Sequence, residues 1–261
     1  MKKLVLLING NLGLRVLEFI ISQGEIEITG VVINSTKKRN STYLNLVSSL
    51  LQQFDTNVPI LSFEDTADNH NRIESILNVS DFGISALFGH VLPGKLLENV
   101  ECEIINLHPS LLPIGRGADP IPWSIIGQQK QGITIHIIDS GLDTGNILAQ
   151  KEFDTSIGMN SGEIYDLATD LLLEELENIF ASWINRSIQV SAQSETHSSS
   201  HKSSELENIR IIDSKEVATF GEFLRRLQAL TFSDCRKPLF VDESGRLWRI
   251  DISMTPDGDK D

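Results

Sequence analysis

Residues 103–113, "EIINLHPSLLP", place Asn106 and His108 two positions apart at the end of an apolar run, with Pro109 immediately after. Such a run is typical of a strand, in which alternate side chains share a face, so Asn106 and His108 lie together and Leu107 points away. Pro109 has no backbone donor and is typical of a strand end. A carboxamide suits a developing oxyanion, and an imidazole can take or give a proton near neutral pH.

Two carboxylates follow the later strand-like run "GITIHIID", in the turn "SGLDTG". They are Asp139 and Asp143. A carboxylate beside a histidine orients the imidazole and favours its protonated form. Spacing alone does not decide which of the two aspartates is that partner. Each polar residue also has a structural interpretation, because Asn and Asp often bond the backbone of a turn.

Strand and helix patterns alternate through the first half of the chain, which predicts an α/β fold with a Rossmann-like, mostly parallel sheet and helices on both faces. We expect strands at residues 4–8, 27–33, 58–63, 82–89 and 102–108, and helices at residues 14–22, 45–54, 71–79 and 92–100.

The second half changes character. Residues 132–139 and 146–153 predict an antiparallel pair, since a short turn joins them. Asn160 and Glu163 form the capping pattern of a long amphipathic helix. A Ser-rich polar stretch, 191–205, follows; we assign its His197 and His201 to a solvated loop without carboxylate partners, not to a metal site.

A final helix, at residues 220–230, precedes a β-hairpin at residues 237–253 that turns at "ESG". These patterns predict three parts. Residues 1–185 form the catalytic domain, residues 186–206 a polar linker or loop, and residues 207–261 a small C-terminal α+β appendage with a β-hairpin.

The net charge of −14 is spread unevenly, with 11 Lys+Arg and 23 Asp+Glu in residues 1–183 against 11 and 13 in residues 184–261. Neither part is basic, which argues against general binding to nucleic acid or a membrane surface. Two distant cysteines, Cys102 and Cys235, predict buried thiols in a reducing cytoplasm. No set of ligands has metal-site spacing, so no metal is expected. The short N-terminal apolar run is interpreted as a buried strand, not as a signal peptide.

The turn "NGNLGLR" lies between the first strand and the first helix, where a dinucleotide fingerprint would lie, but only two of its three glycines are present. After the second strand comes "NSTKKR", which could bind the extra phosphate of NADP, so an NADP-dependent reductase is a competing hypothesis. We favour a solvated basic loop there. We expect Asn9, Gly10 and Asn11 to touch substrate, because backbone donors at a helix start suit anions.

Four further pieces occur in order: Asn-x-His before "PSLLP", Arg116–Gly117, the segment from Pro120 to Gly127, and "DSGLDTGNI" from Asp139 to Ile147. Together they resemble the folate-dependent formyltransferases over residues 1–185. The resemblance is strongest to the sugar-nucleotide N-formyltransferases and extends to the catalytic core of the methionyl-tRNA enzymes.

The resemblance implies transfer of a formyl group from 10-formyltetrahydrofolate to an amine. Asn106 would be the oxyanion donor and His108 the general acid/base. The second aspartate of the turn, Asp143, would orient His108 and assist proton transfer. His136 is interpreted as a packed core histidine. Folate-binding residues would be Leu87, Phe88, Gly89, His90, Val91, Leu92, Asp139 and Gly141, largely through backbone groups.

Substrate-binding residues would be Asn9, Gly10, Asn11, Ser110, Arg116 and Gly117. Arg116 has two equal interpretations, as a substrate anchor or as an ion-pair brace of its loop. The short C-terminal tail resembles that of the sugar enzymes, which implies an amino-sugar nucleotide as substrate and a cytoplasmic homodimer. Methionyl-tRNA is the alternative; it ranks lower because the tail is short and not basic. Ile114 and Gly115 are less polar than expected for close sugar contacts.

Overall fold

The computed structural model describes residues 1–34, 41–54, 56–194, 196–232 and 237–254. It divides into two compact units. The first comprises Met1–His108, Thr134–Ala149 and Leu172–Gln193, and the second Pro109–Ile133, Gln150–Leu171 and Ser194–Asp261. Residues 35–39 of the basic cluster and Cys235 lie outside the described residues, and their interpretation stays a prediction.

A seven-stranded sheet runs in the order β3-β2-β1-β4-β5-β7-β8. Parallel pairing joins β3 to β2, β2 to β1, β1 to β4 and β4 to β5, and β7 pairs antiparallel with β5. The α/β fold with a mostly parallel sheet is confirmed. The strands are β1 (Lys2–Ile8), β2 (Ile26–Ile33), β3 (Ile60–Ser62), β4 (Phe82–Ala86), β5 (Glu103–His108), β7 (Gln131–Ile137) and β8 (Ile147–Phe153).

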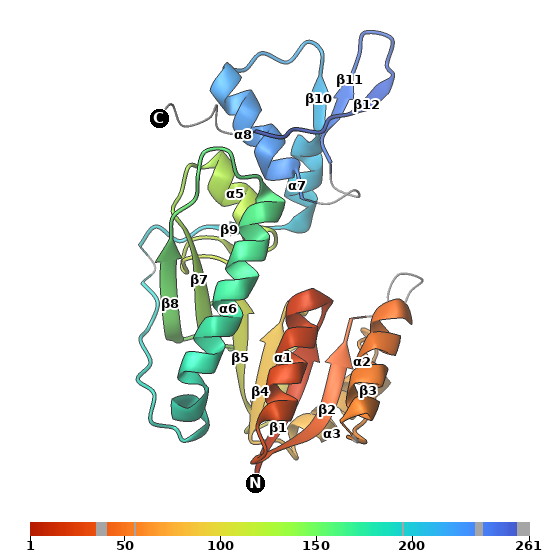
Figure 1. The fold of residues 1–261 in the computed structure, drawn as a ribbon, viewed down its shortest axis with the longest axis vertical. Coiled ribbons are helices and arrows are strands. Elements are labelled where there is room, and N and C mark those ends of the chain that lie inside the picture. The colour runs from red at the N-terminus through yellow and green to blue at the C-terminus, as the bar shows by residue number, and fades with distance from the viewer. Residues whose placement is uncertain (35–40, 55, 195, 233–236, 255–261) are drawn as a thin grey trace, which may run out of the picture. The chain divides into compact units, whose positions relative to one another are not determined.

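Helices of the first unit connect its strands and cover the sheet (Figure 1). The edge-to-face contact of Phe19 in α1 with Phe180 in α6 places these two helices on the same face. Asn160 caps α6 as predicted: its Oδ1 accepts from the backbone of Gly162 and Glu163, and Glu163 accepts from the backbone of Asn160. The helices are α1 (Gly10–Ser22), α2 (Ser41–Gln53), α3 (Ala67–Leu77), α4 (Gly94–Glu98), α5 (Pro120–Ile126) and α6 (Ser161–Ile184).

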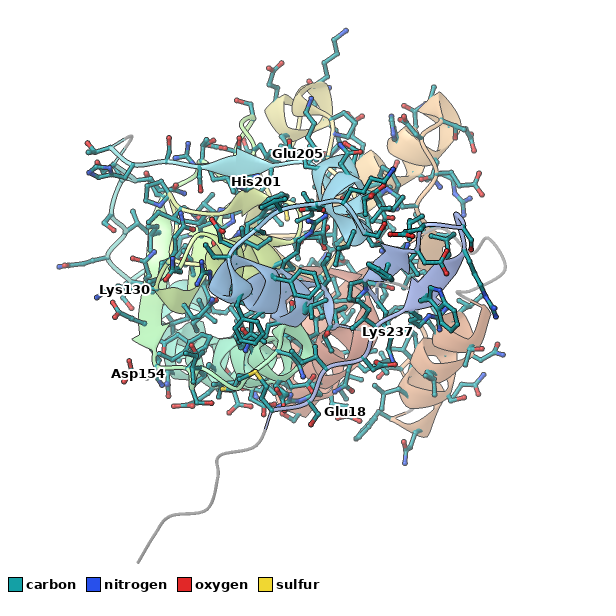
Figure 2. The ribbon with its side chains drawn as sticks, turned by 90° about the horizontal axis from the view of Figure 1, so that it is seen from above. Glu18, Lys130, Asp154, His201, Glu205 and Lys237 are labelled. Carbon is teal, nitrogen blue, oxygen red and sulfur yellow. The ribbon has the colours of Figure 1, made fainter. Side chains whose placement is uncertain are left out.

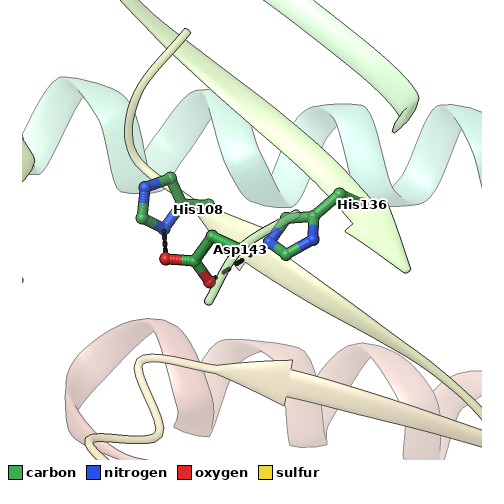
Figure 3. A group of neighbouring side chains, drawn as sticks. All are labelled: His108, His136 and Asp143. Atoms are coloured by element: carbon green, nitrogen blue, oxygen red, sulfur yellow. Dashed lines mark ion pairs between the residues drawn. The ribbon is translucent and has the colours of Figure 1, made fainter. Parts of the chain in front are cut away.

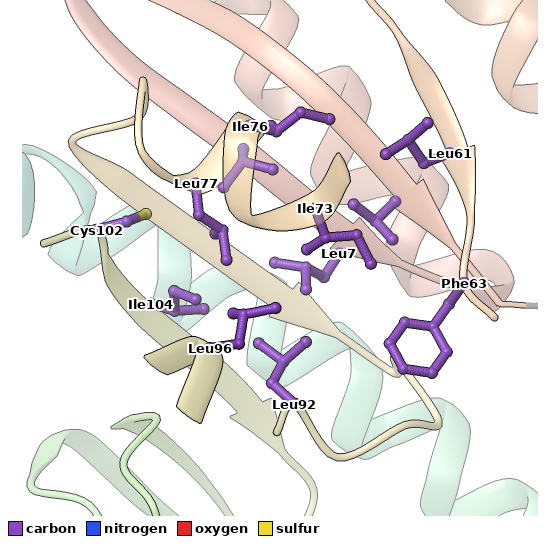
Figure 4. Close-up of a cluster of buried hydrophobic side chains, with 12 residues drawn as sticks. Leu7, Leu61, Phe63, Ile73, Ile76, Leu77, Leu92, Leu96, Cys102 and Ile104 are labelled. Carbon is purple, nitrogen blue, oxygen red and sulfur yellow. The ribbon is translucent and has the colours of Figure 1, made fainter. Parts of the chain in front are cut away.

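The apolar residues of β1 alternate between two core layers. Val5 and Leu7 face the cluster drawn in Figure 4, where α3 and α4 cover the sheet. On α6, Trp183 is 1% exposed; its ring packs edge-on against Phe82 of β4, and its Nε1 donates to Glu103 at 2.8 Å. Both faces of the parallel strands are therefore buried, as their continuous apolar runs predict. Cys102 belongs to the first cluster, where burial raises the pKa of its thiol to about 12.

The second unit contains short elements that sequence patterns did not predict. Residues Ser200–His201 form strand β9, which pairs with β6 (Arg116–Gly117), so part of the expected polar linker adds to a small sheet. Helix α7 (Ser203–Arg210) leads into β10 (Ile211–Asp213), which lies parallel to β11. The predicted helix and hairpin are present as α8 (Phe220–Leu230) and the antiparallel strands β11 (Leu239–Val241) and β12 (Leu247–Arg249).

Among the described residues, none of the helices combines the length and the apolar composition needed to span a lipid bilayer.

Candidate active site

The sheet brings three strand ends together. Register aligns Ile8 of β1 with Ala86 of β4, and Ala86 with Leu107 of β5. Between β1 and β4 the strand order reverses, and the carboxyl ends of strands at such a switch point form the usual ligand crevice of α/β sheets. Asn106 and His108 occupy the carboxyl end of β5, so they lie at this edge of the sheet.

The neighbouring strand adds a histidine. β7 runs antiparallel to β5, with His136 directly opposite Asn106 and Thr134 opposite His108. His136 is 1% exposed, as expected for a core histidine. Its Nε2, however, lies 3.2 Å from the Nδ2 of Asn106 and 3.6 Å from Oδ1 of Asp143. Its contacts with two of the expected catalytic residues were not predicted.

The protonation of His136 determines how Asn106 is oriented. Burial, reinforced by the nearby His108, lowers the pKa of His136 to about 4, so the ring is neutral at pH 7. Its Nδ1 faces the carbonyl oxygen of Ile137 at 2.9 Å, which can only accept, so Nδ1 carries the proton. Nε2 then accepts from the Asn106 amide. One N–H of the Asn106 carboxamide is used in this way, and the second remains to serve as a donor.

Asp143 lies in the loop between β7 and β8, with its backbone in the left-handed region at φ 52°. That conformation costs a residue with a side chain about 1 kcal/mol. The loop requires glycine at position 145, because an added Cβ would lie 1.9 Å from the carbonyl oxygen of Ile137. Asp139 braces the same turn by accepting from the Gly141 backbone at 3.0 Å and the Thr144 hydroxyl at 2.6 Å.

Asp143 is thus the aspartate that faces the histidines (Figure 3). Its Oδ2 lies 3.8 Å from Nδ1 of His108, with side chains 16% and 6% exposed. The distance exceeds a direct hydrogen bond, and the pair interacts through charge when His108 is protonated. A carboxamide donor, a titratable imidazole and an anionic partner therefore converge, as acyl transfer to an amine requires.

His108, His136 and Asp143 could also hold a metal ion, because their ligand atoms lie within 4.8 Å of one another. Ligands around tetrahedral zinc are separated by about 3.4 Å, given bonds of about 2.1 Å. The separations of 3.6 and 3.8 Å, which involve the two different oxygens of Asp143, are slightly longer than that. The expectation that the reaction uses no metal stays a prediction.

The expected substrate loop, Asn9 to Asn11, begins α1. Asn9 donates its backbone N–H to Ala86, and its side chain does not cap the helix, which leaves N-terminal donors for a ligand. An added Cβ at Gly10 would lie 3.6 Å from Leu87, so this loop and the expected folate loop are neighbours. Their roles in binding stay predictions.

The expected folate loop, Leu87 to Leu92, follows β4. Leu87 has φ 56°, and the Gly89 N–H donates to Asn34 at 3.2 Å. The His90 ring stacks on Phe63 at 4.3 Å between centroids, and burial lowers its pKa. Val91 is 71% exposed, whereas the Leu92 side chain belongs to the core. Leu92 could therefore serve a ligand only through its backbone.

Ser110, Arg116 and Gly117 belong to the second unit. The hydroxyl of Ser110 donates to the Ile114 carbonyl at 2.8 Å, and its side chain is buried. Arg116 is 8% exposed, and its backbone N–H donates to Ser199. The choice between substrate anchor and loop brace stays open for Arg116.

His201 corrects one expectation about the polar stretch. It is half-buried, not solvated: its ring stacks on Trp123 at 4.2 Å, and its Nδ1 lies 2.9 Å from Oε2 of Glu205 (Figure 2). This carboxylate partner was not predicted: His201 ends β9, and Glu205 lies in the first turn of α7, which begins two residues later. His197 is exposed, as expected.

His136 provides a test of this electrostatic arrangement. Its pKa is lowered in the folded state, so between pH 6.5 and pH 4 the unfolded chain binds more protons and stability falls as pH falls. This group should lower the free energy of unfolding by about 2 kcal/mol at pH 5 relative to pH 7. In urea unfolding, His136→Gln should show a correspondingly smaller loss between pH 7 and pH 5. An unchanged pH dependence would contradict the assignment of a neutral, buried His136.

Comparisons with known proteins give the family of the chain. A family model described as formyl transferase matches residues 2–174, and one described as N-formyltransferase dimerization C-terminal domain matches residues 205–256. A dTDP-4-amino-4,6-dideoxyglucose formyltransferase of Mycobacterium bovis is 35% identical over 195 residues, which are 73% of this chain and 80% of that protein.

Two further comparisons show how widely the likeness extends. A methionyl-tRNA formyltransferase of Clostridium novyi is 40% identical over 118 residues, but these are only 43% of this chain and 38% of that protein. The structure of an N-formyltransferase from Helicobacter canadensis was determined in complex with folinic acid and dTDP-3-aminofucose. It shares the fold at a TM-score of 0.70 and is 20% identical in sequence. The match covers 92% of this chain and 86% of that chain. By its family match over residues 2–174 and its Mycobacterium bovis relative, this chain belongs to the formyl transferase family.

Proposed function

We propose that the protein is an N-formyltransferase that moves the formyl group of 10-formyltetrahydrofolate to the amino group of an amino-sugar nucleotide. The observation that carries the proposal is the convergence of Asn106, His108 and Asp143 at the carboxyl end of β5. We infer that the trio acts as a unit, with His136 orienting Asn106.

Each residue has a defined part in the proposed reaction. The sugar amine attacks the formyl carbon, and the carbonyl oxygen becomes an oxyanion that accepts the second N–H of Asn106. This attack forms the new carbon–nitrogen bond, and collapse of the oxyanion then breaks the bond from carbon to the folate nitrogen. His108 takes the proton lost by the amine and returns one to the folate nitrogen. Asp143 stabilises the imidazolium that exists between these transfers.

Folate as the formyl donor is supported by two observations. The Helicobacter canadensis relative was crystallised with folinic acid, a formylated folate. In this chain, the loop from Leu87 to Leu92 lies next to the start of α1 at the switch point of the sheet, where α/β folds bind ligands. We propose that the folate binds against that loop and that Asp139 and Gly141 also contact it.

A sugar nucleotide as the acceptor is supported by the Mycobacterium bovis relative, whose substrate is dTDP-4-amino-4,6-dideoxyglucose and which matches most of both chains. The acidic charge of the chain disfavours an RNA acceptor, because RNA binding needs cationic surface. We propose Asn9, Gly10 and Asn11 of the first unit as contacts for the sugar nucleotide, and the roles of Ser110, Arg116 and Gly117 of the second unit stay predictions.

The test is a direct product assay. The protein would be incubated with 10-formyltetrahydrofolate and a panel of amino-sugar nucleotides, starting with dTDP-4-amino-4,6-dideoxyglucose, and with methionyl-tRNA in parallel. Mass spectrometry should find a formylated sugar nucleotide and unmodified methionyl-tRNA. Formylation of methionyl-tRNA alone would overturn the sugar assignment, and no formylation of any amine would overturn the reaction.

We also propose that the enzyme is a cytoplasmic homodimer, with residues 207–261 as the appendage that pairs two copies. The match of residues 205–256 to a dimerization domain supports this assembly. Trp248 and Leu247 in the hairpin are 47% and 56% exposed, and covering such side chains favours association. Sedimentation should give a dimer at micromolar concentration, and a monomer there would count against it.

A further inference from the structure

Asp143 is carried by a loop whose hydrogen bonds come both from inside the loop and from a distant side chain. Its backbone has φ 52°, and the loop spans only residues 138–146 between β7 and β8. Within the loop, the carboxylate of Asp139 accepts from the Gly141 backbone and from the Thr144 hydroxyl. The backbone carbonyl groups of Asp143 and Gly145, on either side of Thr144, accept hydrogen bonds from outside the loop.

A side chain fifty residues away supplies those bonds. The Nε2 of Gln193 donates to the carbonyl oxygen of Asp143 at 2.9 Å and to that of Gly145 at 2.8 Å. A carboxamide nitrogen has two hydrogens, so this single group satisfies both carbonyls. Gln193 is half-buried and lies in the stretch where the sequence predicts only a linker.

The backbone beside Gln193 is itself fixed. Ser191 and Ile147 form an antiparallel bridge, with N–H to O distances of 2.8 and 2.9 Å in the two directions. Ile147 is the first residue of β8, immediately after the Asp143 loop. Gln193 follows Ser191 by two residues. It therefore extends to the loop from a segment that is hydrogen-bonded to the same sheet.

We propose that Gln193 is a positioning residue for the proposed formyl transfer: it holds the Asp143 loop so that the carboxylate faces His108 and His136. This inference rests on the catalytic role of Asp143 in the proposed function. Gln193 bonds the backbone of the Asp143 loop, so its removal should reduce turnover through Asp143 and leave substrate binding intact.

Three variants test the proposal. Gln193→Met keeps the length and loses both donors, and Gln193→Glu keeps the shape but puts a carboxylate against two carbonyl oxygens. Hydrogen-bond partners that orient metal ligands typically contribute about 10- to 100-fold, and we expect a similar scale for a partner that orients a catalytic carboxylate. We expect kcat to fall by about 10-fold for Met and further for Glu, with KM for both substrates unchanged. The matched control is Gln189→Met, an exposed glutamine in the same segment, which should retain full kcat.

A double-mutant cycle separates positioning from general destabilisation. In an Asp143→Asn background, Gln193→Met should cause no further loss of kcat, because its effect passes through the carboxylate. A further loss equal to that in the wild-type background, or a Gln193→Met enzyme with normal kcat, would overturn the inference alone. An Asp143→Asn enzyme as fast as the wild type would instead overturn the catalytic role in the proposed function.

Discussion

Replacing His108 with alanine is expected to lower kcat by about two to four powers of ten, the usual contribution of a positioned acid or base. The proposed reaction moves a proton from the amine to the folate nitrogen, and His108 is the buried imidazole beside Asp143 at the end of β5. Folate binding should change little, since the side chain acts on the reacting atoms. Steady-state kinetics with the formylated product as readout, and calorimetry with a folate analogue, would measure the two effects.

Two controls make the His108 result specific. His197→Ala removes an exposed histidine and should retain normal turnover. Added imidazole should restore part of the activity of His108→Ala, because it can fill the vacated space and exchange protons. A His108→Ala enzyme with wild-type kcat would remove the acid/base role. A loss of folate affinity with kcat preserved would make His108 a binding residue.

Replacing Asn106 with alanine should cost about two to three powers of ten in kcat, the effect of deleting one oxyanion donor. The structure supports this role because neutral His136 accepts one amide N–H of Asn106, which orients the carboxamide with its second N–H available. Asn106→Asp should be at least as slow, because a carboxylate keeps the shape but offers no donor and repels the oxyanion.

The kinetic pattern distinguishes the oxyanion role from substrate binding. An interaction made only in the transition state lowers kcat and kcat/KM equally. A raised KM with kcat unchanged would place Asn106 in ground-state binding instead. Asn78→Ala, at an exposed asparagine after α3, is the matched control and should leave both constants unchanged.

Much of the sheet and of the helix boundaries could be predicted from local patterns. Continuous apolar runs predicted the buried parallel strands, and the cap pattern at Asn160 and Glu163 predicted the start of α6. These succeed because strand burial and helix capping depend on residues close in sequence. The pairing of Asn106 with His108 on one strand face follows from the two-residue period for the same reason.

The choice between Asp139 and Asp143 needed more than local pattern. Both lie in one turn, and only the fold shows that Asp139 bonds Gly141 and Thr144 while Asp143 faces the histidines. The short strands β9 and β10 were likewise missed, since two or three residues carry too little periodicity to predict a strand.

The sequence by itself determined the α/β architecture, the polar pair at the end of β5 and the glycine-rich turn that carries two aspartates. Only the tertiary structure decided that His136 orients Asn106 and that Gln193 bonds the Asp143 loop, contacts that join residues 30 and 50 positions apart. The physical reason is that the antiparallel register of β5 and β7, and the bridge between Ser191 and Ile147, depend on how distant segments pack, which no local spacing encodes.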